Sequence, residues 1–202
     1  MNKMLPIVAL CSAAILTTIL LNGCDKTASA NVQAPQPHLS TFLSLHNQYC
    51  EKKYDTPESL QSSLDKAPEL APAKDFNGVY EVHVNGISFA VSPEEDGCTT
   101  DVMVQTSDNK ELFSFEDINK ALLSVGYVET GEPVSRKDLG TDQSELTIIE
   151  KKYISPKGEI TTLDFPLEKK DKYYMTLFAE KFSEAKRETK ERIIQSLKMA
   201  SK

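Results

Sequence analysis

Apolar and polar residues alternate most regularly on either side of Asn85-Gly86. The apolar side chains fall on every second position in each flank: Tyr80, Val82 and Val84 before the dipeptide, and Ile87, Phe89 and Val91 after it. Asn-Gly suits a type I′ turn, because both of its central residues need a positive φ. We therefore expect a β-hairpin, followed by a third strand where the alternation returns at Cys98 and continues to Val104.

Apolar residues spaced by three and four positions predict helices elsewhere. The first is expected over about 40–51, with Cys50 on its buried face, and a shorter one begins at Thr56-Pro57. The residues from Ser114 to Asp117 resemble a capping box and predict a helix over about 115–125. The charged tail from about 183 to 199 is predicted to be a further helix.

The second half of the chain repeats this order of elements. Residues 129–144 are polar and predict a loop, after which alternation returns in three segments, near 146–153, 160–165 and 173–177. The predicted class is α+β, with two antiparallel three-stranded units, at about 79–104 and 146–178. Each unit is followed by a helix, and the N-terminal helices pack on the sheet. The residues of the two units do not match, so duplication and coincidence both remain open.

An apolar run from Leu5 to Leu21 follows Lys3 and ends in small residues and a cysteine, which is typical of a signal peptide. Leu21-Asn22-Gly23-Cys24 resembles the lipobox of bacterial lipoproteins, although Asn22 is less usual at its position. The resemblance implies cleavage before Cys24 and acylation of that residue, which would anchor the chain stably without a spanning helix. An uncleaved membrane anchor is the alternative interpretation, since about seventeen apolar residues is near the lower limit for spanning.

The expected domain organisation follows from this boundary. Residues 1–23 are a cleaved signal peptide, 24–38 are the lipidated cysteine and a flexible tether, and 39–202 are a single globular domain. Asp25 resembles the residue that retains lipoproteins in the inner membrane of enteric bacteria, so the inner membrane is slightly favoured over the outer. The globular part resembles only uncharacterised lipoproteins of Gram-negative bacteria.

Charge and cysteine content narrow the functional classes. The net charge is −7, and loss of Lys3 with the signal peptide would make it about −8, which disfavours nucleic acid and suits a basic protein partner. Of the four cysteines, Cys11 would leave with the signal peptide and Cys24 would carry lipid. Cys50 and Cys98 then remain as an isolated pair, which predicts a disulfide in the oxidising periplasm.

Chemical motifs are sparse. The histidines His38, His46 and His83 lie in the tether, on a buried helix face and on an outer strand face, without metal-ligand spacing. The acidic segment Glu94-Glu95-Asp96-Gly97 lacks the alternating ligands of a calcium loop. No signature of a nucleophile elbow, phosphate loop or dinucleotide site occurs, so we expect no catalytic residue, cofactor or metal.

Two functions fit these features. The first is a lipid-anchored, periplasm-facing protein that acts by protein binding, as an adaptor or accessory of an envelope assembly. The second is a periplasmic immunity or inhibitor lipoprotein that neutralises a toxin or a lytic enzyme. Tight, salt-sensitive binding to a single basic protein would favour the inhibitor.

Overall fold

The computed structural model describes residues 37–105, 113–139, 145–167, 172–181 and 187–200. Its helices are α1 (Pro37–Leu45), the π-helix η1 (His46–Glu51), α2 (Pro57–Leu64), α3 (Phe115–Ser124) and α4 (Arg187–Ala200). Its strands are β1 (Ala71–Pro72), β2 (Tyr80–Val84), β3 (Ile87–Glu94), β4 (Gly97–Gln105), β5 (Val128–Leu139), β6 (Glu145–Ile154), β7 (Ile160–Pro166) and β8 (Lys172–Glu180).

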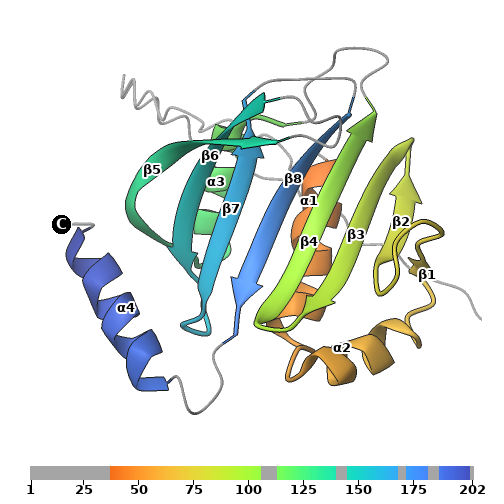
Figure 1. The fold of residues 1–202 in the computed structure, drawn as a ribbon, viewed down its shortest axis with the longest axis horizontal. Coiled ribbons are helices and arrows are strands. Elements are labelled where there is room, and N and C mark those ends of the chain that lie inside the picture. Colours follow the sequence, from red (N-terminus) through yellow and green to blue (C-terminus); the bar gives the residue numbers. More distant parts are fainter. Residues whose placement is uncertain (1–36, 106–112, 140–144, 168–171, 182–186, 201–202) are drawn as a thin grey trace, which may run out of the picture. The chain divides into compact units, whose positions relative to one another are not determined.

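All of these strands form one antiparallel sheet in the order β1-β2-β3-β4-β8-β7-β6-β5 (Figure 1). The α+β class is confirmed, but the sheet is a single eight-stranded one rather than two three-stranded units. The sheet consists of two meanders, β1 to β4 and β5 to β8. They are joined because β4 pairs with β8, with Val102 opposite Met175. Each meander also has a fourth strand that the alternation did not indicate, β1 in the first and β5 in the second.

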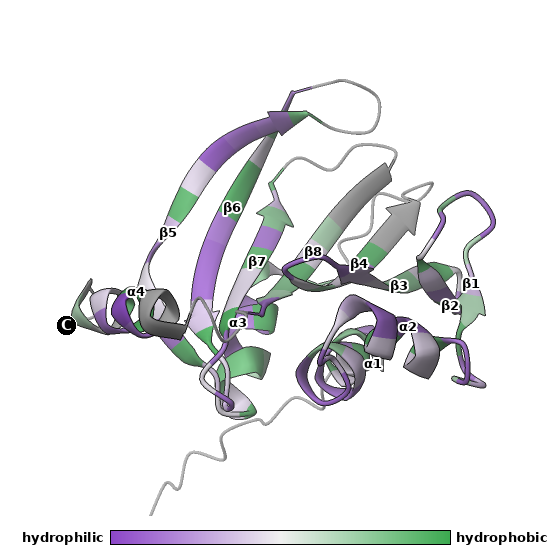
Figure 2. Cartoon of the chain, turned by 60° about the horizontal axis from the view of Figure 1, so that its bottom comes forward, coloured by the Kyte–Doolittle hydropathy of each residue, from purple (hydrophilic) through white to green (hydrophobic). Residues whose placement is uncertain are grey.

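Strand β5 corrects the prediction of a loop over 129–144. It is an outermost strand of the sheet, and most of its side chains are exposed, so polar and charged residues are compatible with it (Figure 2). The register with β6 shifts between Thr130 and Val134. Gly131 and Pro133 lie in that interval, where a residue without a backbone N–H costs no ladder hydrogen bond. Residues 140–144 are outside the described part.

The predicted Asn85-Gly86 hairpin is confirmed. Its two turn residues have φ values of 51° and 82°, as a type I′ turn requires. Strands β2 and β3 pair in register across it, with Val84 opposite Ile87. The alternation around the turn therefore sets which side chains of this hairpin face the core.

The predicted N-terminal helix is confirmed, although it begins earlier and changes form. Helix α1 starts at Pro37, and its last turns continue as η1, with i→i+5 hydrogen bonds in place of i→i+4. The sequence placed His38 in the tether, whereas the structure places it on α1, where its ring stacks on Phe89 with centroids 6.3 Å apart. Leu39, the third residue of this helix, is buried.

The other helix predictions also agree with the structure. Thr56 and Ser59 form a reciprocal capping box at the start of α2, and Ser114 and Asp117 do the same for α3. Helix α4 covers Arg187–Ala200 and contacts β5, while residues 183–186 of the predicted helix lie outside the described part.

The core lies between one face of the sheet and the helices α1, η1, α2 and α3. Its largest fully buried members come from both layers: Phe42, Tyr49, Leu60, Leu64, Phe89, Ile118, Leu122, Tyr153, Leu163, Met175 and Leu177. Successive strand residues point to opposite faces, so the residues between these strand positions lie on the other side of the sheet.

A disulfide ties the helical layer to the sheet. Cys50 of η1 and Cys98 of β4 are bonded, with their Cα atoms 5.2 Å apart, and both side chains are fully buried. This is the pair that the cysteine content singled out, and it joins the two elements expected from the sequence.

Candidate functional site

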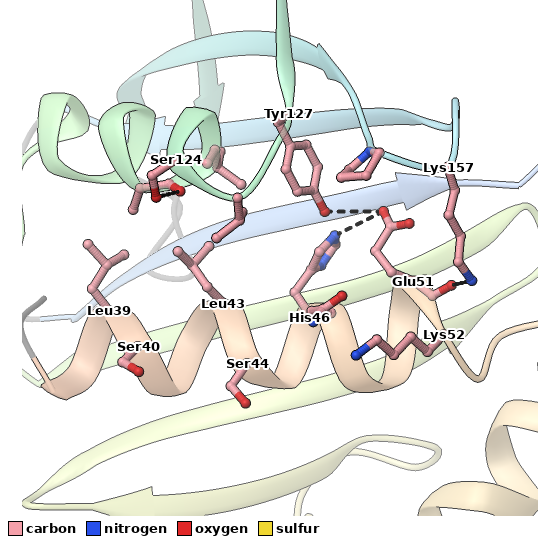
Figure 3. Close-up of a pocket in the computed structure, with 15 residues that line it drawn as sticks. Leu39, Ser40, Leu43, Ser44, His46, Glu51, Lys52, Ser124, Tyr127 and Lys157 are labelled. Carbon is pink, nitrogen blue, oxygen red and sulfur yellow. Dashed lines mark hydrogen bonds and ion pairs between the residues drawn. The ribbon is translucent and has the colours of Figure 1, made fainter.

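A groove of about 560 Å³ opens between the first helical segment and the end of α3 (Figure 3). One wall comes from α1 and η1. The other comes from α3, from Tyr127 just after it, and from the β6–β7 turn at Pro156 and Lys157. The groove therefore lies on the helical side of the sheet, beside the disulfide-linked segment.

The two ends of the groove differ in chemistry. The end beside α1 and α3 is lined by aliphatic side chains: Leu39, Leu43, Ala121, Leu122 and Val125. The end beside η1 and the β6–β7 turn carries hydrogen-bonding and charged groups: His46, Glu51, Lys52, Tyr127 and Lys157. The groove is thus amphipathic along its length.

The π-helix brings the two buried polar groups of this end together. His46 and Glu51 are five residues apart, which is the hydrogen-bonding interval of a π-helix, so they lie near the same side of the segment. In an α-helix, residues at this spacing would be about 140° apart around the axis. His46 is 1% exposed and Glu51 is 4% exposed.

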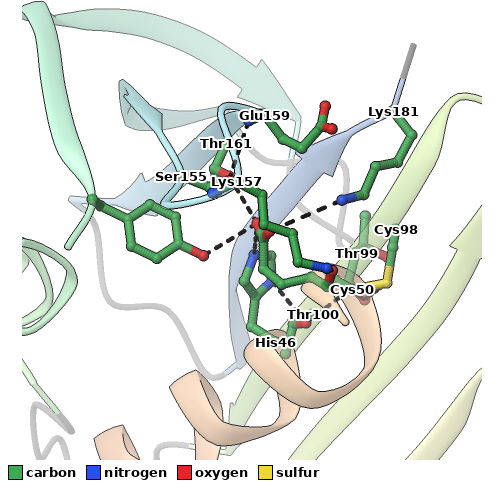
Figure 4. A network of polar contacts seen from close by, with 12 residues as sticks. His46, Cys50, Cys98, Thr99, Thr100, Ser155, Lys157, Glu159, Thr161 and Lys181 are labelled. Carbon is green, nitrogen blue, oxygen red and sulfur yellow. Dashed lines mark hydrogen bonds and ion pairs between the residues drawn. A yellow bond between two sulfur atoms is a disulfide. The ribbon is translucent and has the colours of Figure 1, made fainter. Parts of the chain in front are cut away.

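Glu51 is the centre of a buried polar network, and Figure 4 shows its partners His46, Thr161 and Lys181. Its Oε1 accepts hydrogen bonds from the hydroxyl of Tyr127 at 3.2 Å and from that of Thr161 at 3.5 Å. Nζ of Lys181 lies 4.0 Å from Oε2, within ion-pair range. Nε2 of His46 lies 3.8 Å from Oε1, which is too long for a hydrogen bond. The carboxylate is therefore held mainly by hydroxyl donors and one ammonium group.

Burial decides the protonation of His46. Desolvation lowers the pKa of its imidazole, and the neighbouring carboxylate of Glu51 offsets that effect only in part. The neutral ring has one donor and one acceptor nitrogen. We assign the proton to Nε2, which faces Glu51. Nδ1 then accepts a hydrogen bond from the hydroxyl of Thr100, at 3.1 Å.

The pKa of the Glu51 carboxyl responds to the same surroundings. Desolvation raises it, but the contacts with His46, Lys181 and Tyr127 together lower it below its ordinary value. Burial is also the main reason that the pKa of Tyr127 is raised, so its hydroxyl remains a donor. At neutral pH this end of the groove holds an ionised carboxylate, a neutral imidazole and a phenol.

Two lysines lie at the polar end. Lys157 donates from Nζ to the backbone carbonyl of Glu51, which fixes the β6–β7 turn against η1. Lys52 follows η1 directly and is exposed. His46 contacts Thr100 and Glu51, and the hydroxyl of Thr100 is fully buried, so it is not presented to a substrate in the groove. The arrangement is therefore suited to holding a ligand.

A second polar cluster lies on the face of the sheet opposite the core. Arg136 of β5 reaches across Glu150 of β6, at 3.4 Å, to Asp164 of β7, at 2.7 Å, and also pairs with Asp138. On the neighbouring strands, the hydroxyl of Thr176 donates to Asp101 at 2.6 Å. Three carboxylates thus share one guanidinium group, and a fourth lies two strands away.

Burial shifts the carboxyl groups of this face. Desolvation raises the pKa of Asp101 to about 6, although the hydrogen bond from Thr176 opposes the shift. Desolvation likewise raises the pKa of Asp164, against the favourable charge of Arg136. This face of the sheet is acidic, and two of its carboxyl groups, Asp101 and Asp164, are partly buried.

The structure separates the other residues that the sequence singled out. His83 is exposed beside Glu81, and the acidic segment Glu94–Gly97 forms the turn between β3 and β4. Cys24 and the lipobox lie outside the described residues. Within the described ranges, no group of three or more histidine, cysteine, aspartate or glutamate side chains is placed to hold a metal ion.

The sequence did not indicate Glu51, Lys157 or the groove. Glu51 looks like an ordinary solvent-facing residue after Cys50, because an α-helical period would turn it away from His46. Its partners Tyr127, Thr161 and Lys181 come from separate elements. No local pattern carries that information.

Comparisons of the chain with protein-family models, curated proteins and solved structures found no match. Among the helices in the described ranges, none has both the length and the hydropathy needed to cross a bilayer.

Proposed function

We propose that this chain is a lipoprotein anchored through Cys24, which faces the periplasm of a Gram-negative bacterium and acts there by binding a protein, without catalysis. The observation that carries the proposal is the acidic face of the sheet opposite the core. Among the described helices, α1, η1, α2 and α3 all pack on the other face. The remaining helix, α4, contacts the outer strand β5. The charged side chains of β4 to β7 lie on the side of the sheet that α1, η1, α2 and α3 leave uncovered.

The chemistry of that face favours a basic partner. Across β4, β5, β6 and β7 it carries the carboxylates Asp101, Asp138, Glu150 and Asp164, against Arg136 and Lys152. Complementary charge steers association and makes it dependent on ionic strength. A basic patch on the partner would also stabilise the ionised form of Asp101.

The lipid anchor is proposed from the likeness of Leu21–Cys24 to a lipobox. An acylated chain would hold the domain near the membrane surface, with the inner membrane slightly favoured because of Asp25. Within this setting the adaptor role comes first, and an immunity or inhibitor protein directed at a basic toxin or lytic enzyme is the alternative.

The test is a crosslinked pull-down of the tagged full-length protein from its own envelope at low and high salt, read by mass spectrometry. The variant Asp101→Asn with Asp138→Asn removes two charges from the acidic face, and Glu116→Gln with Glu145→Gln removes two exposed charges elsewhere. We expect capture to fall with the first pair and not with the control pair.

The identity of the captured proteins separates the two functions. A set of envelope-assembly components supports the adaptor, and one dominant basic protein that is lost at high salt supports the inhibitor. Capture that is equal for wild type and both variant pairs, or no specific capture at all, would overturn binding through the acidic face.

A further inference from the structure

We propose that the groove between α1–η1 and α3 binds a linear acyl chain that carries an anionic head group. This site lies on the helical side of the sheet and does not depend on the protein-binding function proposed for the opposite face. The ligand class follows from the size of the groove, from its two chemically different ends and from the two lysines that border the polar end.

The dimensions fit a small, elongated molecule. The volume of about 560 Å³ lies within the range of sites that enclose small ligands. The groove follows the first helical segment from Leu39 to Lys52 (Figure 3), which is roughly 20 Å at a rise of about 1.5 Å per residue. A narrow chain would use this length, whereas a compact polar solute would leave the aliphatic end uncovered.

The aliphatic end supplies the affinity for the chain. Leu39 and Leu43 face Ala121, Leu122 and Val125 across it. Val125 is 57% exposed although it lies in this apolar setting. Leu43 and Ala121 are half-buried, so covering these two and Val125 with methylene groups removes apolar surface from water on both partners.

The polar end supplies the preference for a negative charge. The ammonium groups of Lys52 and Lys157 both border it, in a chain whose net charge is −7. Nε2 of His46 is buried behind this end and faces Oε1 of Glu51 at 3.8 Å, so the lysines are the cationic groups that border the groove. A carboxylate or phosphate oxygen placed at this end would pair with the lysines.

The carboxylate of Glu51 does not cancel this preference. Its Oε1 already accepts from Tyr127 and Thr161, and its Oε2 faces Lys181. Its charge is therefore offset within the network, while Lys52 and Lys157 border the groove itself.

The experiment uses membranes that contain the full-length protein and a photoreactive palmitic-acid analogue with a diazirine in the chain. After irradiation, mass spectrometry maps the labelled peptides. We expect label in the peptides that contain Leu43 and Val125, and competition by unlabelled palmitate. A matched analogue with an alcohol in place of the carboxylate is expected to label at least threefold less.

Two variants test the two ends separately. Ala121→Trp fills the aliphatic end and is expected to lower labelling by both probes about tenfold, while Val134→Trp, on exposed β5, leaves it unchanged. Lys52→Glu is expected to lower labelling by the carboxylate probe at least threefold and to spare the alcohol probe, with Lys53→Glu as its neighbouring control. Because Lys52 is exposed, this second test does not depend on tolerance of a bulky residue in the groove.

Competition also distinguishes the two sources of such a ligand. Displacement by palmitate alone assigns a free fatty acid, and displacement by lysophosphatidylglycerol assigns an anionic lysophospholipid. Label spread over the surface, equal labelling by the two probes, or labelling unaffected by both Ala121→Trp and Lys52→Glu would overturn the proposal. None of these results bears on the pull-down through the acidic face.

Discussion

Individual buried charges in this chain are held by a few specific donors, and Asp101 shows this most simply. It lies on β4 and accepts from Thr176 of the neighbouring strand β8. Desolvation nevertheless dominates and raises its pKa to about 6. The folded protein therefore takes up a proton at Asp101 at a higher pH than the unfolded chain does.

This shift predicts a pH-dependent effect of Asp101→Asn. The contribution of Asp101 to the free energy of unfolding is largest below about pH 4 and is lost as the pH rises through about 6, because the folded state then holds an ionised, buried carboxylate. At pH 7 the amide should raise the free energy of unfolding by about 1–2 kcal/mol, less than the full shift implies because the amide accepts less strongly from Thr176.

Urea unfolding of wild type and variant from pH 4 to pH 8 measures this difference. The two proteins should have similar stability near pH 4, diverge between about pH 4 and pH 6, and differ by a constant amount at higher pH. A difference that stays constant over the whole range would contradict the assigned titration.

The environments of single residues could be predicted from the sequence only in part. The burial of His46 and the exposure of His83 follow from helical and strand periods, and both are seen. The burial of Glu51 does not follow, because it depends on a π-turn and on donors from distant strands. His38 was assigned to the tether because proline and polar residues precede it, while its stacking on Phe89 is a tertiary contact.

Among the secondary-structure elements, η1 is fixed to its neighbours by a covalent bond and a hydrogen bond. The Cys50–Cys98 disulfide attaches it to β4, and Lys157 attaches it to the β6–β7 turn. The cysteines are 48 residues apart in sequence, so the bond closes a long loop of the unfolded chain. In the chain-entropy model a loop of that length corresponds to about 4 kcal/mol.

We therefore expect Cys50→Ser and Cys98→Ser each to lower the free energy of unfolding by about 4 kcal/mol, since either change removes the same crosslink. Thermal and urea unfolding of the two single variants and the double variant measure this. The double variant should be close to each single one. Free thiols mapped at both positions in oxidised wild-type protein would exclude the bond.

Strand β5 depends on a different kind of contact. It lies at one end of the sheet, and Arg136 links it to β6 through Glu150 and to β7 through Asp164. The side chains of this cluster are partly exposed, so solvent screens each pair. The network acts mainly on the position of the outer strand.

Arg136→Ala should loosen β5 selectively. We expect a loss of about 1 kcal/mol in the free energy of unfolding, because three carboxylates then remain without their shared cation. Amide hydrogen exchange should become faster in Val128–Leu139 and change little in β3 and β4. Lys137→Ala, which removes an exposed pair with Glu145, is the control and should leave the exchange pattern unchanged.

Elements were predictable where local chemistry alone defines them. Asn85-Gly86 requires positive φ at both residues, and Ser114 with Asp117 caps a helix, so both features are legible in the sequence. Strand β5 was not, because its bulge near Pro133 interrupts the alternation and its exposed side chains are polar. An outer strand of this kind has the composition of a loop.

For the whole molecule, the proposed lipid anchor gives the most direct prediction. Cys24→Ser removes the acylation site of the lipobox and should transfer the protein from the membrane fraction to the soluble fraction. Fractionation followed by immunoblotting measures the change, and Cys11→Ser, within the same apolar run, is the matched control. If the variant stays in the membrane with its apolar segment attached, the result would contradict the lipoprotein and favour the uncleaved membrane anchor.

The joining of the two meanders could not be predicted from either one. Each meander is a run of neighbouring strands whose turns are local, whereas β4 and β8 meet across most of the second half of the chain. Periodicity reports which face of a strand is buried and says nothing about which distant strand lies beside it. The single eight-stranded sheet is thus a property of the whole chain.

That central pairing has a consequence for the order of events during synthesis. β4 has emerged long before β8, so one edge of the first meander stays without its neighbour until nearly the whole polypeptide is available. Pairings of such sequence separation slow folding, and an open strand edge is a site of self-association while it waits. Nascent chains truncated before Lys172 should therefore be the form of this protein most prone to aggregate.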